Sequence, residues 1–203
     1  MDQNLINKNT GNPIDIDKNK IIVENQTLLL ILDIQEKIIR NIPNKELILF
    51  NIKKLIETCD LLKVHIAITE QNPLKLGKTV KSIIGDKGYP IYEKMEFSCS
   101  KNKNLLEYLA KYKIKNIILC GIESHICILQ SSIELLGKGF NILIARDAIG
   151  SRHIIDNDTA FLRLISSGAV ASTTESLICE LCKTSNRKEF REISKILKNT
   201  FSS

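Results

Sequence analysis

The chain has 203 residues, of which 43% are hydrophobic and 26% are charged. A chain of this size and composition can bury enough apolar surface for one α/β domain, and nothing in it indicates a second domain. The formal net charge is +6, but aromatic residues make up only 5% of the chain and tryptophan is absent. Because the sequence lacks the aromatic platforms of nucleic-acid-binding proteins, we expect no nucleic-acid partner.

The apolar segments are too short for a membrane protein. The longest unbroken aliphatic run, from Leu28 to Leu32, covers five residues, whereas a membrane-spanning helix needs about 20. The six cysteines fall mostly inside apolar segments, not at the spacings of a disulfide framework, and no signal-peptide pattern precedes them. We therefore expect free thiols, no membrane partner and a cytoplasmic location.

The order of apolar segments predicts the fold. Residues 1–24 are rich in Asn, Asp and Lys with little apolar periodicity, which predicts an extension before a domain at 25–203. Apolar runs predict strands at 27–33, 64–69, 91–93, 116–120, 141–145 and 169–172. Helical spacing predicts helices at 45–62, 104–112, 124–137, 156–167, 174–183 and 188–197, with a long loop at 70–89. Continuously apolar strands that alternate with helices indicate a mostly parallel, doubly wound sheet in a three-layer α/β/α sandwich.

Three reactive side chains follow the predicted strands. Ligands of such sheets bind beyond the carboxyl ends of the strands, which is where this sequence places Asp33, Lys94 and Cys127. Cys127 lies in the first turn of a predicted helix, whose partial positive charge favours the thiolate and lowers the pKa of a cysteine. We therefore expect Cys127 to be a nucleophile and the most reactive of the six thiols.

Each of these residues also has an ordinary structural explanation. Cysteine often packs as a small buried hydrophobe, an aspartate after a strand often caps a loop or helix, and most lysines are solvated. The joint placement of Asp33, Lys94 and Cys127 at one edge of the sheet favours the functional interpretation. We expect Asp33 and Lys94 to matter more for turnover than for folding, because they place charge at a solvent-reachable strand end.

An ordered set of short motifs resembles the isochorismatase-like, or cysteine hydrolase, superfamily and, within it, the isochorismatase-domain-containing branch. The resemblance extends from about residue 26 to residue 198, and its order along the chain is more specific than any single motif. The motifs are residues 31–37 (ILDIQEK), 69–73 (TEQNP), 94–98 (KMEFS), 120–127 (CGIESHIC), 146–148 (RDA) and 172–175 (STTE).

The resemblance implies a hydrolase that cleaves a C–N bond through a thioester on Cys127. Asp33 would act as general base toward the thiol, and Lys94 would hold both anionic groups in position. Backbone N–H groups of Glu123 and Cys127 would stabilise the oxyanion, with a non-proline cis peptide between Ile122 and Glu123.

The resemblance also implies the surroundings of the site. It points to a small-molecule substrate of the amide or carbamoyl type and to a homo-oligomer, in which a neighbouring subunit could help to form the pocket. The residues that it implies for substrate binding are Gln35, Glu70, Gln71 and Phe97.

Two alternative functions remain open. One is a nicotinamidase-like, metal-assisted amidase, whose metal is held by an Asp and two His near the second-strand loop. This chain has the segment 69–73 (TEQNP) there and no His, so we expect no metal and no cofactor. The other alternative is a catalytically silent protein that keeps the fold for interaction or regulation, which the presence of Asp33, Lys94 and Cys127 together disfavours.

Overall fold

The computed structural model describes residues 21–201, so most of the predicted extension, residues 1–20, lies outside the described residues. The described residues build one sheet in the order β3-β2-β1-β4-β5-β6, in which every neighbouring pair is parallel. The strands are β1 (Thr27–Leu32), β2 (His65–Gln71), β3 (Ile91–Lys94), β4 (Asn116–Ile122), β5 (Asn141–Gly150) and β6 (Val170–Ser172).

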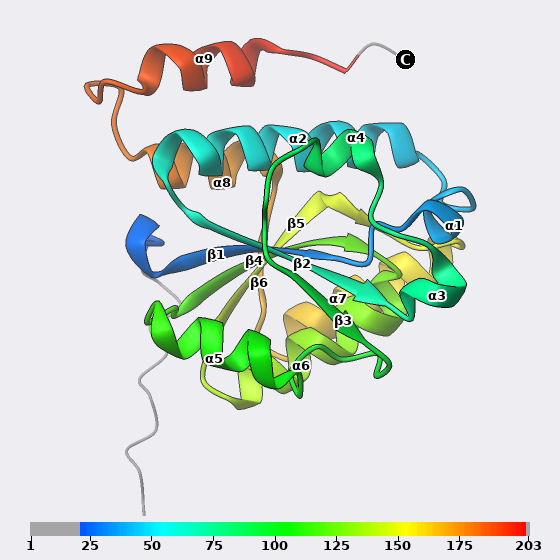
Figure 1. Ribbon diagram of the computed structural model, residues 1–203. Helices are drawn as coiled ribbons and strands as arrows, with labels where there is room; N and C mark the ends of the chain where they lie inside the picture. Colours follow the sequence, from blue (N-terminus) through cyan, green and yellow to red (C-terminus); the bar gives the residue numbers. More distant parts are fainter. Residues whose placement is uncertain (1–20, 202–203) are drawn as a thin grey trace, which may run out of the picture.

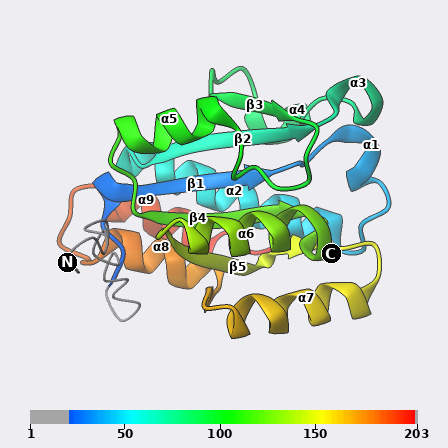
Figure 2. The same ribbon diagram turned by 90° about the horizontal axis from the view of Figure 1, so that it is seen from below.

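Helices cover both faces of this sheet. Figures 1 and 2 show α2, α8 and α9 on one side and α5, α6 and α7 on the other, which confirms the predicted three-layer α/β/α sandwich. None of the helices within residues 21–201 is long and apolar enough to cross a membrane. The longer helices are α2 (Lys45–Leu62), α5 (Lys103–Lys111), α6 (Leu129–Gly137), α7 (Ile154–Ser166), α8 (Thr174–Cys182) and α9 (Phe190–Lys198).

Five shorter helical segments complete the described chain. The α-helices of four residues each are α1 (Glu36–Ile39), α3 (Pro73–Leu76) and α4 (Lys81–Ile84). A 3-10 helix, η1 (Glu24–Gln26), precedes β1, and a π-helical segment, η2 (Ser124–Ile128), leads from β4 into α6. Single helical turns leave no periodic pattern in a sequence, which is why the predicted loop at 70–89 concealed α3 and α4.

The side chains of β1 divide the core into two halves. Leu29 and Ile31 belong to the apolar cluster that includes α2 and α8, whereas Leu28, Leu30 and Leu32 belong to the cluster that includes α5 and α6. Because neither face of β1 meets solvent, the strand is apolar along its whole length.

The boundaries of the elements differ from the predicted ones mainly at the carboxyl ends of the strands. Helix α2 has its predicted bounds, but β2 and β4 each continue two residues further than expected. Strand β5 continues to Gly150, because a register shift between Leu119 and Gly121 lets its pairing with β4 resume at Gly121 and Ile149. These extensions carry the strands into the region of the candidate site.

Residues 21–24, which the sequence assigned to the extension, contact the domain. Ile22 is buried in the core, and its N–H donates to Glu180 Oε1 at 2.9 Å. Glu24 forms an ion pair with Arg187 at 2.9 Å. The packed part of the described chain therefore starts at residue 22, slightly before the predicted domain boundary.

At Gly121 of β4 there is no room for a side chain beside the backbone of β1. This residue pairs with Leu32, has a φ of 131°, and would place a Cβ atom 2.1 Å from the carbonyl oxygen of Leu32. No side chain fits in that space, and this backbone conformation is one that glycine tolerates and other residues rarely adopt. Gly121 therefore sets the distance between the strand that ends at Asp33 and the strand that leads to Cys127.

We expect Gly121→Ala to lower the free energy of unfolding by about 3 kcal/mol or more, because the strained φ and the clash with Leu32 add together. Urea denaturation measures this loss. Gly137→Ala is the matched control, since a Cβ there meets nothing within 4 Å; alanine in place of glycine in a helix is stabilising by up to about 1 kcal/mol. Similar unfolding free energies for the two variants would contradict the close approach.

Candidate active site

Asp33 stands at the carboxyl end of the central strand β1. Its φ of 54° lies in the left-handed region, so the chain turns away from the sheet directly after Leu32. The Asp33 N–H donates to the carbonyl oxygen of Thr69 at 3.2 Å, and the Asp33 carbonyl accepts from the N–H of Gln35 at 2.7 Å. The backbone of Asp33 is thus tied to β2 on one side and to its own loop on the other.

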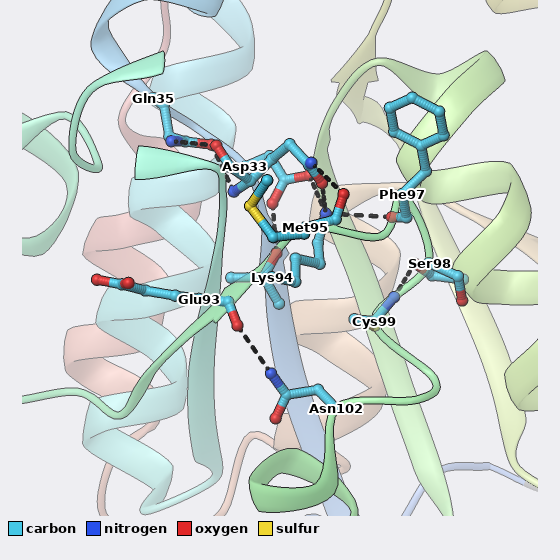
Figure 3. A network of polar contacts seen from close by, with 12 residues as sticks. Asp33, Gln35, Glu93, Lys94, Met95, Phe97, Ser98, Cys99 and Asn102 are labelled. Carbon is cyan, nitrogen blue, oxygen red and sulfur yellow. Dashed lines mark hydrogen bonds and ion pairs between the residues drawn. The ribbon is translucent and has the colours of Figure 1, made fainter. Parts of the chain in front are cut away.

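The carboxylate of Asp33 forms a buried ion pair with Lys94, the last residue of β3. Lys94 Nζ lies 2.7 Å from Asp33 Oδ2, and the two side chains are 2% and 1% exposed. Lys94 Nζ also donates to Gln71 Oε1 at 2.9 Å and to the Phe97 carbonyl at 3.1 Å, and the Thr69 hydroxyl donates to Asp33 Oδ1 at 2.6 Å. Asp33, Gln71 and the Phe97 carbonyl provide acceptors for all three N–H donors of the ammonium group, and Figure 3 shows its contacts with Asp33 and Phe97.

The burial of this pair corrects one sequence-based prediction. Asp33 and Lys94 were expected to lie at a solvent-reachable strand end and to matter little for folding, but neither side chain meets solvent to any useful extent. A buried charge without its ion-pair partner strongly destabilises the folded protein. The two residues therefore support the fold as well as any chemistry.

Cys127 lies in η2, the π-helical segment that follows β4, and is 5% exposed. Burial raises the pKa of the Cys127 thiol, and the negative charge of Asp33 raises it further, while the positive charge of Lys94 acts in the opposite direction. Cys127 is therefore near enough to the ion pair for both charges to influence its thiol.

The direction of the Cys127 pKa shift is opposite to the prediction. The sequence placed the thiol at a helix N-terminus, where thiolate is favoured, but it could not show that the group is withdrawn from water beside a carboxylate. Desolvation favours the neutral thiol over the thiolate. Cys127 therefore needs a base before it can act as a nucleophile.

The turn between β4 and η2 also differs from the expectation. Residues 21–201 contain no cis peptide bond, so the predicted cis bond between Ile122 and Glu123 is wrong. The chain turns instead through Glu123, which has a φ of 48°. In the turn after this left-handed residue, the N–H of Ile126 donates to the carbonyl oxygen of Glu123 at 2.9 Å.

Three of the four predicted substrate-binding residues, Gln35, Glu70 and Gln71, have their polar side-chain atoms occupied by the protein. Gln35 is fully buried, and its amide bonds the backbone of Gln71 and Gly77. Glu70 is 1% exposed and accepts from the N–H and hydroxyl of Thr79 at 2.7 and 2.8 Å. Gln35 and Glu70 therefore brace the segment after β2.

Gln71 and Phe97 remain next to the ion pair. Gln71 donates to the Met95 carbonyl at 2.7 Å while accepting from Lys94, so it links the ammonium group to the next loop. Phe97 is 51% exposed, and its ring points away from Lys94 while its carbonyl faces the ammonium group (Figure 3). Phe97 is the predicted substrate-binding residue whose side chain is free to meet a ligand.

Sequence reasoning missed the residues that hold the loop after Lys94. The N–H of Cys99 donates to Ser131 Oγ at 3.0 Å, and the Ser100 hydroxyl bonds the carboxylate of Glu134. Ser131 and Glu134 belong to α6, the helix that continues from Cys127. In the sequence they are two of four polar residues in the amphipathic segment 129–137, and that pattern does not reveal the partner loop.

The donor set near β2 does not fit a metal. The positions that hold the metal in nicotinamidases correspond here to the segment 69–73, and two of its side chains, Thr69 and Glu70, already have protein partners. Across residues 21–201 there is no group of three or more His, Cys, Asp or Glu side chains placed to hold a metal ion.

Comparison with known proteins identifies the family. A family profile described as the isochorismatase domain matches residues 27–176. The chain belongs to the isochorismatase family. Isochorismatase family protein 1A of Dictyostelium discoideum is 35% identical over 174 residues, covering 83% of this chain and 84% of that protein. Human isochorismatase domain-containing protein 2 is 32% identical over 177 residues, covering 87% and 85%.

A solved structure extends this similarity to three dimensions. The MAR1 ribonuclease from Caenorhabditis elegans superimposes with a TM-score of 0.85 at 31% identity, covering 91% of this chain and 95% of that chain. The superfamily resemblance and the isochorismatase-like fold expected from the motifs are both confirmed.

We expect Asp33→Asn or Lys94→Met alone to lower the free energy of unfolding by about 3–5 kcal/mol, because each leaves a buried charge without its partner. The double variant should lose less than the sum, since it removes both charges. Urea denaturation of the four proteins gives the coupling energy. Lys195→Met, which breaks an exposed ion pair with Glu192, is the control and should cost under about 1 kcal/mol; additive losses at Asp33 and Lys94 would contradict the coupling.

Proposed function

We propose that this member of the isochorismatase family is a metal-independent cysteine hydrolase that cleaves the C–N bond of a small amide or carbamoyl compound. The observation that carries the proposal is the buried Asp33–Lys94 ion pair at the carboxyl edge of the sheet, where Cys127 is also buried and both charges influence its thiol. A nucleophile, a base and a cation within one buried cluster are what acyl transfer through a thioester requires.

The first half of the reaction forms the thioester. Asp33 takes the proton from the Cys127 thiol, and the thiolate attacks the carbonyl carbon of the substrate. The carbonyl electron pair moves to oxygen, where N–H groups of the turn from Glu123 to Cys127 stabilise the charge. Asp33 then gives its proton to the departing nitrogen, the C–N bond breaks, and an amine or ammonia leaves.

The second half restores the enzyme. Asp33 takes a proton from water, and the resulting hydroxide attacks the thioester carbon. The C–S bond breaks, the acid product leaves, and the proton on Asp33 returns to the sulfur of Cys127. Lys94 remains positively charged throughout and offsets whichever negative charge is present, on Asp33 or on the sulfur.

The surroundings favour a small substrate with one flat, apolar part. Cys127 is 5% exposed, so only a narrow group can reach the sulfur. Phe97 and Met95, 51% and 66% exposed, offer apolar surface on the loop that follows Lys94. An aromatic or short aliphatic amide fits this combination better than a long or highly charged one.

Two properties of the whole protein belong to the same proposal. We place it in the cytoplasm, because all six cysteines are unpaired thiols. We also propose a homo-oligomer, since Ile154, Ile155 and Leu162 on α7 are each 69% exposed or more and offer an apolar surface to a second copy. Light scattering coupled to size-exclusion chromatography measures the oligomeric state.

The decisive experiment is a screen for ammonia or amine release from small amides, ureido and carbamoyl compounds. We expect at least one compound to be turned over by the wild-type protein and activity to fall by about 100-fold or more in Cys127→Ser. RNA belongs in the same screen because the Caenorhabditis elegans relative is named a ribonuclease. RNA cleavage that survives Cys127→Ser would refute the cysteine mechanism, and a silent protein with no turnover of any compound would favour the regulatory alternative.

Asp33→Asn should separate thiol reactivity from turnover. The Asp33 carboxylate is one of the causes that raise the pKa of Cys127. Without it, iodoacetamide should label Cys127 several-fold faster at pH 8 than in wild type. Turnover should nevertheless fall by about 100-fold or more, because the base is gone. Lys94→Met removes the group that lowers this pKa, so labelling should slow. Mass spectrometry after brief alkylation measures both.

Two other cysteines serve as internal controls in that experiment. Cys179 is exposed and lies on α8, so its labelling rate should not change. Cys59 is fully buried and becomes labelled only if a variant unfolds. Slower labelling of Cys127 in Asp33→Asn, with Cys59 still protected, would contradict the assigned role of Asp33.

Metal removal tests the nicotinamidase-like alternative. Because the segment after β2 offers no set of metal ligands, dialysis against EDTA should leave turnover within about twofold of the untreated protein. A large loss that returns on adding zinc or iron would favour the metal-assisted amidase.

A further inference from the structure

A second polar cluster surrounds the side chain of Glu123, in the turn between β4 and η2, the segment that contains Cys127. This carboxylate is 9% exposed, and its Oε1 atom accepts from Arg152 Nε at 2.7 Å. Within the described residues the other oxygen, Oε2, has no hydrogen-bond partner. A largely buried carboxylate needs a partner charge to stay ionised, so Arg152 is the residue on which this group depends.

His125 cannot replace Arg152 as that partner. Its Nδ1 atom lies 3.3 Å from Glu123 Oε2 but also 3.0 Å from Ser151 Oγ, and its Nε2 atom is 3.8 Å from Asp156 Oδ2. The imidazole is a cation only when protonated, whereas a guanidinium is always charged. Arg152 therefore provides the lasting countercharge for Glu123.

The ion pair between Glu123 and Arg152 connects the ends of β4 and β5. Glu123 follows β4 and opens η2, whereas Arg152 follows β5, and the last residues of these strands, Ile122 and Gly150, pair in the sheet. The left-handed φ of 48° at Glu123 is unfavourable for a residue other than glycine and persists only where its surroundings hold it. The ion pair supplies such a restraint on the side chain of the strained residue itself.

We propose that Arg152 is a positioning residue, which acts through the carboxylate of Glu123 to hold the turn whose N–H groups stabilise the oxyanion. The inference rests on the proposed function. Arg152 would then touch neither the substrate nor the sulfur of Cys127. Removal of Arg152 should weaken the stabilisation of an oxyanion by the turn and leave the reactivity of the Cys127 thiol unchanged.

Two probes of Cys127 distinguish these effects. A neutral aldehyde such as benzaldehyde adds reversibly to the sulfur as a hemithioacetal: the C–S bond forms, the carbonyl electron pair moves to oxygen, and the thiol proton ends on that oxygen. The adduct's oxygen occupies the place of the oxyanion. Iodoacetamide forms a C–S bond by displacing iodide and creates no oxyanion. Because benzaldehyde carries no anionic group, a direct contact with Arg152 cannot explain a change in its binding.

The experiment measures how benzaldehyde protects Cys127 from iodoacetamide, with mass spectrometry as the readout. In Arg152→Met we expect the aldehyde inhibition constant to rise about tenfold, because displaced N–H donors stabilise the oxygen less well, while the alkylation rate without aldehyde stays within about twofold. Arg152→Lys, which keeps a cation of similar reach, should restore most of the protection. Arg163→Met, on the exposed face of α7, is the control and should match wild type.

Each outcome has one meaning. An unchanged benzaldehyde inhibition constant in Arg152→Met would overturn the positioning role. An equal fall in aldehyde protection and in alkylation rate, together with a lower melting temperature, would also overturn it, because it would indicate a general loss of stability. Failure of the proposed function is recognised separately in the wild-type protein, by the absence of any benzaldehyde protection at Cys127. In that case the turn stabilises no oxyanion, and the role of Arg152 falls with it.

Discussion

The buried ion pair between Asp33 and Lys94 connects the ends of three strands. Asp33 follows β1, Lys94 ends β3, and the strand between them, β2, contributes Thr69 and Gln71 as hydrogen-bond partners of the pair. Taking two charges out of water is unfavourable, and their attraction offsets this only when the remaining polar atoms are also satisfied. Here the three ammonium donors all have acceptors, so the pair is rigid. The loop that carries Phe97 is held by the same ammonium group.

This arrangement explains why the thiol beside it is held in its neutral form. Burial and the negative charge of Asp33 raise the pKa of Cys127, while the positive charge of Lys94 acts in the opposite direction. A neutral buried thiol resists adventitious alkylation and oxidation, because both depend on the thiolate. The proposed mechanism uses the same carboxylate to release the nucleophile when a substrate is present, so protection and activation come from one group.

Backbone geometry brings the thiol to the ion pair. Gly121 allows β4 to lie against Leu32 without an intervening side chain, and the left-handed residues Asp33 and Glu123 turn the chain sharply just after β1 and β4. Both turns are local departures from regular structure at the carboxyl edge of the sheet, where ligands of parallel α/β folds bind. Arg152, which follows β5, forms an ion pair with Glu123 in the turn after β4. The candidate site is therefore formed at the carboxyl ends of five strands that are neighbours in the sheet, β3, β2, β1, β4 and β5.

The sequence by itself determined the fold class and the family, and it indicated Asp33, Lys94 and Cys127 as the candidate site residues. Parallel strands covered on both faces are apolar throughout, so β1 and α2 could be located from residue types alone, and Asp33, Lys94 and Cys127 stood out as reactive groups directly after apolar runs. Only the tertiary structure decided the burial of the ion pair, the direction of the Cys127 pKa, the occupied amide of Gln35 and the contact of Arg152 with Glu123. These properties depend on distances between residues far apart in the chain and on the exclusion of water around them, and neither quantity is encoded in local periodicity.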